Sequence, residues 1–523
     1  MSTAGDLVRA NTTVALGTAV SRITGFIRFA LLVALVDGAL ADSYNTANNL
    51  PNQVYELVLG GVLTASIIPL FTEYTDKKDH EAVGVIMGTS LVVALIITIA
   101  SVALSPFIVL LYTLRTPSSI AVGQFRSVTL LFSVLLLPQV FFYSLTFLVQ
   151  ALLNARRRFF AAAWAPVVNN VVVILAMSSL GSKLKTDRTL AAAAKSNTIV
   201  YVLGGATTAG IVLMALFLLP ALRQAGIPLK LRVNRKHPAV RQLVRLSVWT
   251  VGYTVANQIS LFLVTVLARP GSSGVTVYQI AYLIVQLPIG LLAMSVITTF
   301  GPELARERMA RRRDGLADKL MLGLGAIVGL LLPVGAGLVA LNRPLVSVLL
   351  EHGNFKNAPP VMLAHTLAGF GVGLFALGGY LFVLRGFFAH NDTRTPFAIN
   401  VVQNVINIVL AVVLVGSHGV VGLAWAFSIS YVIAFALALV SLRNKLGGAL
   451  PLGRLATSVV RVGIASVVTA EVAWLAGQLF GSDGGAGAYL RLIVGSIAGV
   501  AAYLASLVLM DAPELDPVRS LGR

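Results

Sequence analysis

The chain has 523 residues, of which 57% are hydrophobic and 11% are charged. Soluble domains carry about 25% charged residues, so this chain has too few to cover a surface that faces water. The net charge of +19 does not indicate nucleic-acid binding, because Lys and Arg lie in short segments between apolar runs, and the absence of cysteine excludes disulfides and thiolate metal sites.

Apolar runs of 18 or more residues recur along most of the chain, which is typical of helices that cross a ~30 Å hydrocarbon core. Outer-membrane barrels would show short alternating segments instead. We therefore predict an all-α polytopic membrane protein with fourteen transmembrane helices. The predicted spans are 8–36, 43–71, 82–104, 127–153, 160–180, 196–220, 241–268, 275–302, 320–341, 361–384, 396–416, 418–442, 456–480 and 488–510.

The distribution of Lys and Arg orients these spans. With the N-terminus in the cytoplasm, 27 of the 39 basic residues fall on the cytoplasmic side and ten fall outside. Cytoplasmic loops of membrane proteins carry such an excess, so we expect both termini in the cytoplasm. The loop 181–195 departs from the rule, because it is assigned to the outside and carries four basic residues.

Two arginines lie inside the first predicted span. Arg22 and Arg28 are six residues apart, which places them about 120° apart on a regular helix. Gly25 lies between them and permits a bend that can turn both guanidinium groups toward one cavity. An intramembrane arginine is costly, and its planar fork suits phosphate oxygens, so the pair suggests an anionic, phosphorylated substrate. The alternative is that Arg22 reaches the interface or pairs with Glu56.

The second predicted span begins with polar residues. They are spaced three and four apart and share one helical face, which predicts contact with a cavity or the bundle interior. The residues on this face are Asp42, Asn45, Asn49 and Asn52. Pro51 kinks the helix, and Gly60 and Gly61 soften it, so all three are candidate hinges together with Gly25. Gly60 and Gly61 can equally serve close packing between helices.

Further amides lie in later spans. They are Asn169, Asn170, Asn400, Gln403, Asn404 and Asn407. These side chains either line a cavity or hold helices together, and Asn400, Asn404 and Asn407 are candidates for a cation site. The histidines show no metal-ligand spacing, and no nucleotide-binding loop or catalytic nucleophile stands out, so we predict neither a bound metal nor an enzyme.

The chain repeats itself at an offset of roughly 235 residues: 150–170 and 384–407 share a basic turn, a proline that starts the next span, and asparagines further in. Six spans per copy in the same orientation predict two pseudo-symmetric six-helix lobes in a V shape plus two extra C-terminal helices, a geometry typical of alternating-access transporters. The predicted domains are 1–220 for the N-terminal lobe, 221–240 for a basic cytoplasmic linker, 241–442 for the C-terminal lobe and 443–523 for the extra helices and tail.

Several stretches resemble the MurJ (MviN) family over nearly the whole chain. They are SRITGFIR (21–28), DSYNTANNLPNQVYELVLGGVLTASIIPLFTEY (42–74), ALLNARRRFFAAAWAPVVNN (151–170), FFAHNDTRTPF (387–397) and HGVVGLAWAFS (418–428). That family flips lipid II, the undecaprenyl-pyrophosphate-linked precursor of peptidoglycan, to the outer face of the inner membrane. It belongs to the multidrug/oligosaccharidyl-lipid/polysaccharide exporter superfamily. The usage of Ala, Gly and Arg favours an actinobacterial member, and such relatives can carry a cytoplasmic extension after the last span.

The resemblance implies a lipid II flippase of the bacterial inner membrane that takes part in peptidoglycan biosynthesis and cell shape. Its implied partners are lipid II, membrane lipids and proteins of cell-wall synthesis or division, with no nucleic acid. The family's two first-span arginines fall on Arg22 and Arg28, and its second-span aspartate falls on Asp42. Family members often have a basic residue shortly after LPN, where this chain has Tyr55 and Glu56.

Sodium coupling and the exact substrate are left open by the resemblance. Some members bind Na⁺ through carboxylates of the second lobe, where Asn400 and Asn404 offer neutral oxygens, so we expect no cofactor. The membrane potential alone can bias the flip of an anionic headgroup. The two extra spans are predicted to form a groove for the polyprenyl tail. The alternatives are a flippase for another polyprenyl-linked glycan, a drug/cation antiporter of the same superfamily, and a scaffold without transport.

Overall fold

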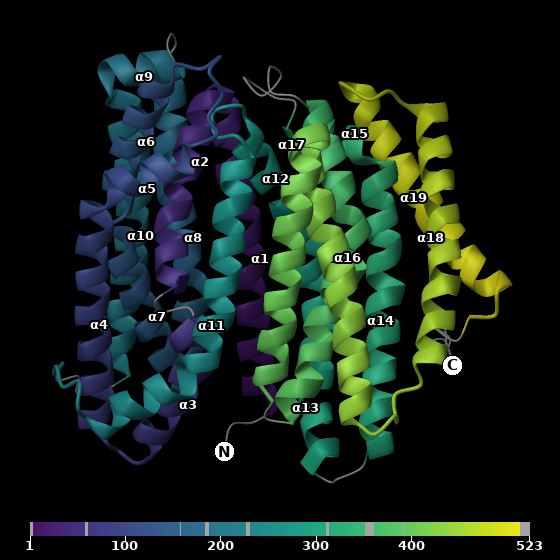
Figure 1. The fold of residues 1–523 in the computed structure, drawn as a ribbon, viewed down its shortest axis with the longest axis horizontal. Coiled ribbons are helices and arrows are strands. Elements are labelled where there is room, and N and C mark those ends of the chain that lie inside the picture. The colour runs from purple at the N-terminus through teal and green to yellow at the C-terminus, as the bar shows by residue number, and fades with distance from the viewer. Residues whose placement is uncertain are drawn as a thin grey trace. The chain divides into compact units, whose positions relative to one another are not determined.

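The computed structural model describes residues 4–57, 61–156, 158–183, 188–225, 231–309, 313–350, 360–390 and 392–512. Every regular element in these ranges is helical, which confirms the predicted fold class (Figure 1). The tertiary contacts divide the chain into two units, and the boundary falls between Thr276 and Val277.

The first unit is built from eleven helices of the described ranges and the first residues of a twelfth. They are α1 (Ala4–Leu35), α2 (Gly38–Tyr55), α3 (Gly61–Asp76), α4 (His80–Ala103), α5 (Ser105–Tyr112), α6 (Val122–Leu136), α7 (Gln139–Ala155), α8 (Phe159–Lys183), α9 (Leu190–Ser196), α10 (Thr198–Gln224) and α11 (Pro238–Leu267), followed by the start of α12 (Gly274–Pro288). Helix α1 packs mainly on α8, α2 on α6 and α7, and α10 on α7 and α8.

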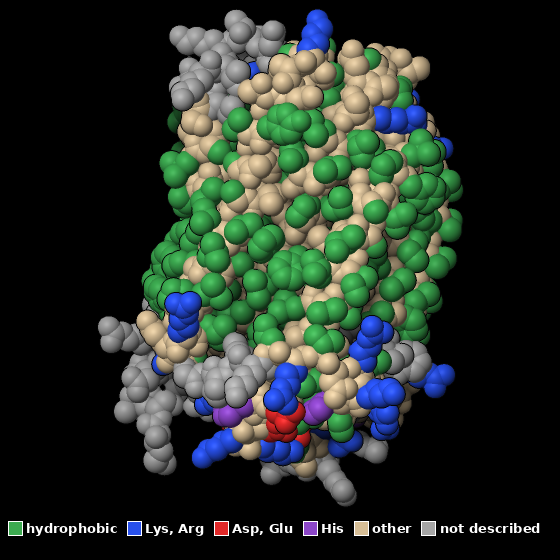
Figure 2. Space-filling model, turned by 90° about the vertical axis from the view of Figure 1, so that its left-hand side faces the viewer, with side chains coloured by type: hydrophobic (Ala, Val, Ile, Leu, Met, Phe, Trp, Pro, Cys, Tyr) green, Lys and Arg blue, Asp and Glu red, His purple; other side chains and the backbone are tan. Residues whose placement is uncertain are grey.

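The outer face of the first unit is apolar in its middle. Figure 2 shows a wide hydrophobic band with Lys and Arg side chains at both of its ends, and Asp, Glu and His side chains at the lower end. Leu95, Ile96 and Ile99 of α4 and Leu216 of α10 are among the large apolar side chains exposed in this unit. A surface of this kind is unfavourable in water and matches the hydrocarbon core of a bilayer.

The second unit begins within α12 and contains a π-helical segment and seven further helices of the described ranges. They are η2 (Ile289–Ala293), α13 (Met294–Met309), α14 (Arg313–Ala340), α15 (Asn342–Leu350), α16 (Pro360–Ala389), α17 (Arg394–Lys445), α18 (Leu452–Phe480) and α19 (Ala486–Leu509). Helix α16 packs between α14 and α17, and α18 packs between α14 and α19.

Small residues allow the close approach of α16 and α17. Ser428 of α17 donates its hydroxyl to the carbonyl of Gly369 at 2.6 Å. A Cβ atom on Gly373 would lie 2.6 Å from Cα of Ser428, so the two backbones meet where glycine leaves room. Interfaces between membrane helices favour small residues for this reason, since the helices gain no hydrophobic driving force inside lipid.

Helix α17 is two spans joined by a sharp reversal. Gly419 has φ 54° and ψ −135°, which is a conformation that favours glycine. Gln403 donates its side-chain amide to the Ser430 hydroxyl at 3.0 Å. On a straight helix the two residues would be about 40 Å apart along the axis, so the chain must double back between them.

Among the described residues, twelve helices are long and apolar enough to cross a membrane. They differ from the fourteen predicted spans in two places. The predicted spans 396–416 and 418–442 are counted as one because both lie in α17, on either side of the reversal at Gly419. The predicted span 43–71 is not counted because it is divided between the polar α2 and the 16-residue α3, with residues 58–60 outside the described ranges. The number fourteen therefore stays a prediction.

The turn between α16 and α17 is held by Asp392. Its carboxylate accepts hydrogen bonds from the backbone N–H of Thr395 at 3.0 Å and from the Thr395 hydroxyl at 2.8 Å. It also pairs with Lys445 at the other end of α17. Partial burial would raise the pKa of Asp392, but the hydrogen bonds from Lys445 and Thr395 outweigh it and lower the pKa from 3.8 to about 2. The carboxylate is thus charged at neutral pH and fastens both ends of α17.

The segment that precedes α11 is docked on α4. The backbone N–H of Arg232 donates to the carbonyl of Gly84 at 3.3 Å, and that of Asn234 donates to the Thr89 hydroxyl at 3.2 Å. A Cβ atom on Gly88 would lie 2.4 Å from the Arg232 carbonyl oxygen. The segment can approach α4 this closely because Gly88 has no side chain.

Helix α11 follows this docked segment and packs against α3 and α4. Tyr74 of α3 donates its hydroxyl to the side-chain carbonyl of Gln242 at 2.8 Å. Contacts therefore group α11 with the first unit, whereas the internal repeat groups residues 241–268 with the second copy. A repeat and a contact unit are different divisions of a chain, and the predicted domain boundaries stay a prediction.

We expect Gly88→Ala to destabilise the protein by about 1–3 kcal/mol, because the added methyl group forces the backbone at Arg232 away from α4. Thermal unfolding of the purified protein in detergent measures this effect. Gly205→Ala is the matched control, since no atom lies within 4 Å of the added methyl group at that position of α10. Equal unfolding temperatures of the two variants would contradict the docking described above.

Candidate functional site

The two arginines of α1 point in different directions. Helix α1 is unbroken from Ala4 to Leu35, so no bend at Gly25 brings the two side chains together. Arg22 is exposed, and Arg28 is half-buried. Six residues of a regular helix leave them about 120° apart, and their joint contact with a substrate stays a prediction. The role of Gly25 as a hinge stays a prediction.

Asn170 of α8 holds α1 in place beside these arginines. Its side-chain amide donates to the carbonyl of Ser21 at 3.0 Å and to the Thr24 hydroxyl at 2.9 Å. A Cβ atom on Gly25 would lie 3.6 Å from the same amide nitrogen, so Gly25 faces α8. Of the two roles open to the amides of this span, the structure supports helix packing for Asn170.

The N-terminal part of the polar face of α2 is buried in the protein. The Asp42 carboxylate is fully buried and accepts hydrogen bonds from the backbone N–H groups of Gly271 and Thr276, both at 2.9 Å. Gly271 has φ 98°, a conformation that favours glycine. Asn45 donates its amide to the Thr276 hydroxyl at 3.0 Å. Asp42 and Asn45 thus fasten α2 to the start of α12.

This geometry favours a structural role for Asp42. Thr276 lies in the first turn of α12, where a negative charge is stabilised by the exposed backbone N–H groups. Both carboxylate oxygens face backbone donors, so neither is directed at a ligand. The predicted substrate contacts of Asp42 and Asn45 stay predictions. In the structure both side chains bond to groups at or just before the start of α12.

The C-terminal part of the same face is more exposed. Asn49 is half-buried, and Asn52 is exposed with its amide donating to the carbonyl of Asn48 at 3.2 Å. Pro51 lies inside α2, and the helix continues past it to Tyr55. Gly61 is helical at the start of α3, and Gly60 falls outside the described residues. The predicted hinges at these positions stay predictions.

A π-helical turn follows at Glu56 and Leu57, where the helical hydrogen bonds are one residue wider. The second copy of the repeat has a π-helix at the matching place, η2, which follows Pro288. Such wide turns occur often at functional sites. Glu56 is exposed, and the ion pairs of the described residues do not include one between Glu56 and either arginine of α1. The suggested pairing is therefore not formed in this structure.

Three aromatic side chains surround this turn. The ring of Tyr55 lies 5.9 Å from the ring of Tyr143 and 6.3 Å from that of Phe147, measured between centroids. Tyr143 and Phe147 come from α7, and the charge of Arg28 acts on Tyr143. We call Tyr55, Tyr143 and Phe147 the aromatic cluster. Tyr143 and Phe147 carry no functional signal in the sequence, because aromatic residues on an apolar helix look like ordinary core.

Gln53 is a second residue that the sequence analysis missed. Its side-chain carbonyl accepts a hydrogen bond from the hydroxyl of Tyr112 in α5, and Tyr112 packs edge-on against Phe262 of α11 with ring centroids 4.7 Å apart. The contact fixes the end of α2 between α5 and α11. The residue stands one position after the polar face, which is why the three-and-four spacing did not include it.

The amides of α17 are buried between helices. Asn400, Gln403, Asn404 and Asn407 are all at most 5% exposed. Asn404 donates to the carbonyl of Asn400 at 2.9 Å, in addition to the bond between Gln403 and Ser430. Within the described residues no three His, Cys, Asp or Glu side chains come together as metal ligands. The predicted cation site at Asn400, Asn404 and Asn407 stays a prediction.

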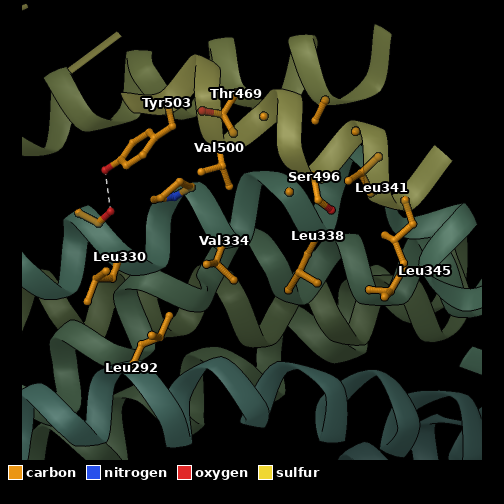
Figure 3. Close-up of a pocket in the computed structure, with 17 residues that line it drawn as sticks. Leu292, Leu330, Val334, Leu338, Leu341, Leu345, Thr469, Ser496, Val500 and Tyr503 are labelled. Carbon is orange, nitrogen blue, oxygen red and sulfur yellow. Dashed lines mark hydrogen bonds between the residues drawn. The ribbon is translucent and has the colours of Figure 1, made fainter. Parts of the chain in front are cut away.

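An apolar pocket lies in the second unit, where α14 meets α18 and α19 (Figure 3). Its volume is about 420 Å³. Figure 3 shows Leu330, Val334 and Leu338 lining it from α14, opposite Val500 and Tyr503 of α19. The Tyr503 hydroxyl donates to the carbonyl of Gly329 at 2.6 Å, which removes one polar group from the wall. The pocket therefore suits a hydrocarbon chain.

The chain is similar to one protein family over most of its length. A family model described as "Lipid II flippase MurJ" matches residues 33–495. Arg22 and Arg28 precede the matched range, whereas Asp42 and the aromatic cluster lie within it. The probable lipid II flippase MurJ of Rhizobium meliloti is 31% identical over 436 residues, which are 80% of this chain and 78% of the relative. The lipid II flippase MurJ of Burkholderia cenocepacia is 27% identical over 405 residues, 75% of each chain.

Solved structures show the same fold. A structure titled "Lipid II flippase MurJ, inward closed conformation" matches with a TM-score of 0.75 and 21% identity, and covers 98% of this chain and 99% of that one. An inward-facing multidrug resistance MATE family transporter of the MOP superfamily matches with a TM-score of 0.68 and 15% identity, over 82% of this chain and 95% of the other.

We expect Asp42→Asn to lower the stability of the folded protein by about 1–3 kcal/mol, because the new amide places an N–H donor against one of two backbone donors. Thermal unfolding in detergent is the measurement. Asn52→Ala removes an exposed amide of the same helix and serves as the control. An unchanged unfolding temperature of Asp42→Asn would contradict the structural role.

Proposed function

The chain belongs to the MurJ family of lipid II flippases, and we propose from this premise that it carries lipid II across the membrane by alternating access. Lipid II has a hydrophilic sugar–peptide headgroup, a pyrophosphate and a long polyprenyl tail. A protein that moves it must hold an anion and sugars out of the hydrocarbon and also give the tail an apolar path. The two units of the chain offer one site for each task.

The position of Arg28 inside α1 is the main support for the proposed anion site. A charged side chain in a membrane helix costs at least ~2.5–3.5 kcal/mol on insertion scales, so it needs a compensating role. Arg28 is half-buried, and its charge acts on Tyr143. Its ion-pair partner is not found among the described residues. A guanidinium group binds two phosphate oxygens at once, so the lipid pyrophosphate is its proposed partner. Arg22, which faces elsewhere on α1, contributes less in this conformation.

The apolar pocket of α14, α18 and α19 supports a site for the tail. Burial of hydrocarbon in such a pocket is favourable by about 0.8 kcal/mol for each CH₂ group. Part of its wall comes from α18 and α19, which are the two helices that the internal repeat leaves unpaired, and the rest comes mainly from α14. A pocket of about 420 Å³ holds part of a polyprenyl chain, with the rest in the bilayer.

The membrane potential supplies a direction for the flip. Moving one charge through 100 mV changes the free energy by about 2.3 kcal/mol. A pyrophosphate with about two negative charges therefore gains roughly 4–5 kcal/mol per 100 mV when it leaves an inside-negative cell. This is sufficient to bias transport outward without an ATP-binding element.

The location follows from the fold and the family. Helices long and apolar enough to span the bilayer and membership of the MurJ family identify a multi-pass protein of the inner membrane. The bias of Lys and Arg supports our proposal that both termini lie in the cytoplasm. Contacts with cell-wall synthesis or division proteins and a coupled Na⁺ ion are further proposals that rest on the family resemblance.

Depletion of the protein from its cells should reduce the lipid II that an externally added lipid II-degrading enzyme can reach. We expect Arg28→Gln to restore this exposure at least about tenfold less well than the unaltered protein, because a charge-assisted bond to pyrophosphate is lost. Arg22→Gln should be impaired less, and Arg28→Lys should lie between. Unchanged exposure after depletion would defeat the proposed function, and equal loss in both Gln variants would defeat the assignment of Arg28.

Filling the apolar pocket should block flipping without unfolding the protein. Gly337 lines the pocket, and no atom lies within 4 Å of a Cβ added there, so Gly337→Phe places a ring in the space. Gly325→Phe is the matched control on α14, since its Cβ is equally unobstructed and it does not line the pocket. We expect severe loss of outer-face lipid II for the first variant alone. Full activity of Gly337→Phe would contradict the proposal that this pocket binds the polyprenyl tail.

A further inference from the structure

The aromatic cluster combines two features that core packing does not require. Tyr55, Tyr143 and Phe147 are each half-buried, with one side packed on the buried core of the first unit. Their rings come from two helices and converge with centroids 5.9 and 6.3 Å from Tyr55. The cluster therefore presents open ring surface beside the π-helical turn that ends α2.

The hydroxyls of Tyr55 and Tyr143 differ from those of Tyr44, Tyr74 and Tyr503. Tyr44, Tyr74 and Tyr503 each have a hydroxyl bonded to a named partner, at 2.8, 2.8 and 2.6 Å. Within the described part of the chain, Tyr55 and Tyr143 have no such bond, and neither hydroxyl is among the buried polar atoms that lack a partner. Both hydroxyls thus keep some accessible surface, through which they can donate to and accept from a ligand.

Arg28 indicates which group of the ligand would lie next to these rings. Its charge acts on Tyr143, so the pyrophosphate that Arg28 is proposed to bind would lie near the cluster. In the lipid-linked substrate the first sugar is attached directly to this pyrophosphate. A sugar ring has one face of C–H groups, which packs on an aromatic ring, and a rim of hydroxyls, which bonds to phenols and amides. Half-buried rings with open hydroxyls match both features.

We propose that Tyr55, Tyr143 and Phe147 form the subsite for the sugar that is joined to the pyrophosphate of the substrate. The inference rests on the proposed function and deepens it, because it assigns recognition of the carbohydrate to the first unit. Tyr143 is the central residue, since its ring lies beside that of Tyr55 and within the electrostatic range of Arg28. The cluster then distinguishes a glycosylated polyprenyl pyrophosphate from the sugar-free lipid.

The test compares two ligands on the purified full-length protein in lipid nanodiscs. The ligands are lipid II and undecaprenyl pyrophosphate, which has the same anion and tail and no sugar. We expect Tyr143→Leu to weaken lipid II binding by roughly fivefold to tenfold and to leave undecaprenyl pyrophosphate binding within about twofold. Tyr143→Phe keeps the ring, so its loss should be smaller and equally confined to lipid II. Phe141→Leu is the control, because Phe141 is a half-buried ring of α7 outside the cluster.

Each outcome bears on a different claim. Equal weakening of both ligands by Tyr143→Leu would overturn the sugar subsite and assign the residue to the support of Arg28 or of the fold. Unchanged binding of lipid II would overturn it as well. If the unaltered protein binds neither ligand, the proposed function fails. If it binds both equally and Tyr143→Leu changes nothing, the function stands and the subsite fails.

Discussion

Inside a bilayer no water is available to the protein's polar groups, so each must find a partner within the chain or border a space that admits water or substrate. Several polar side chains of the first unit follow this constraint. Asn170 bonds to two groups of α1, and Asp42 bonds to two backbone N–H groups at the start of α12. The polar groups that are satisfied this way fix helices. Among the described residues, Arg28 and the hydroxyls of Tyr55 and Tyr143 have no such bond, and we propose that they mark where a ligand belongs.

The chemistry of the substrate is divided between two parts of the chain. The cation and the open phenols lie on α1, α2 and α7 of the first unit, and the apolar pocket lies between α14, α18 and α19 of the second. Each part has the composition that one end of an amphiphilic lipid needs. Because binding of a headgroup and of a hydrocarbon tail depends on different forces, the two sites can be altered independently.

The apolar runs of the sequence predict the helices, since the need to satisfy every backbone group leaves little alternative in lipid. The boundary between the predicted spans 396–416 and 418–442 falls beside Gly419, whose positive φ reverses α17. The direction of individual side chains could not be predicted from the sequence. Asp42 and Asn52 share a face of α2, yet one is fully buried against backbone donors and the other is exposed, because neighbouring helices cover only the N-terminal part of that face. Nothing in the sequence indicates a role for Tyr143, because only the packing of the folded chain leaves its hydroxyl without a partner among the described residues.

The docked segment before α11 bears on how such a protein can arise and be divided. An internal duplication joins two copies end to end, and the linker between them is the natural place to cut. Here that linker is fastened to α4 at Gly84 and Gly88, and the helix after it completes the wall of the first unit. A gene split at the linker would therefore release a first half that lacks one of its own helices. The ancestral boundary between the copies and the present boundary between self-sufficient folding units are no longer the same.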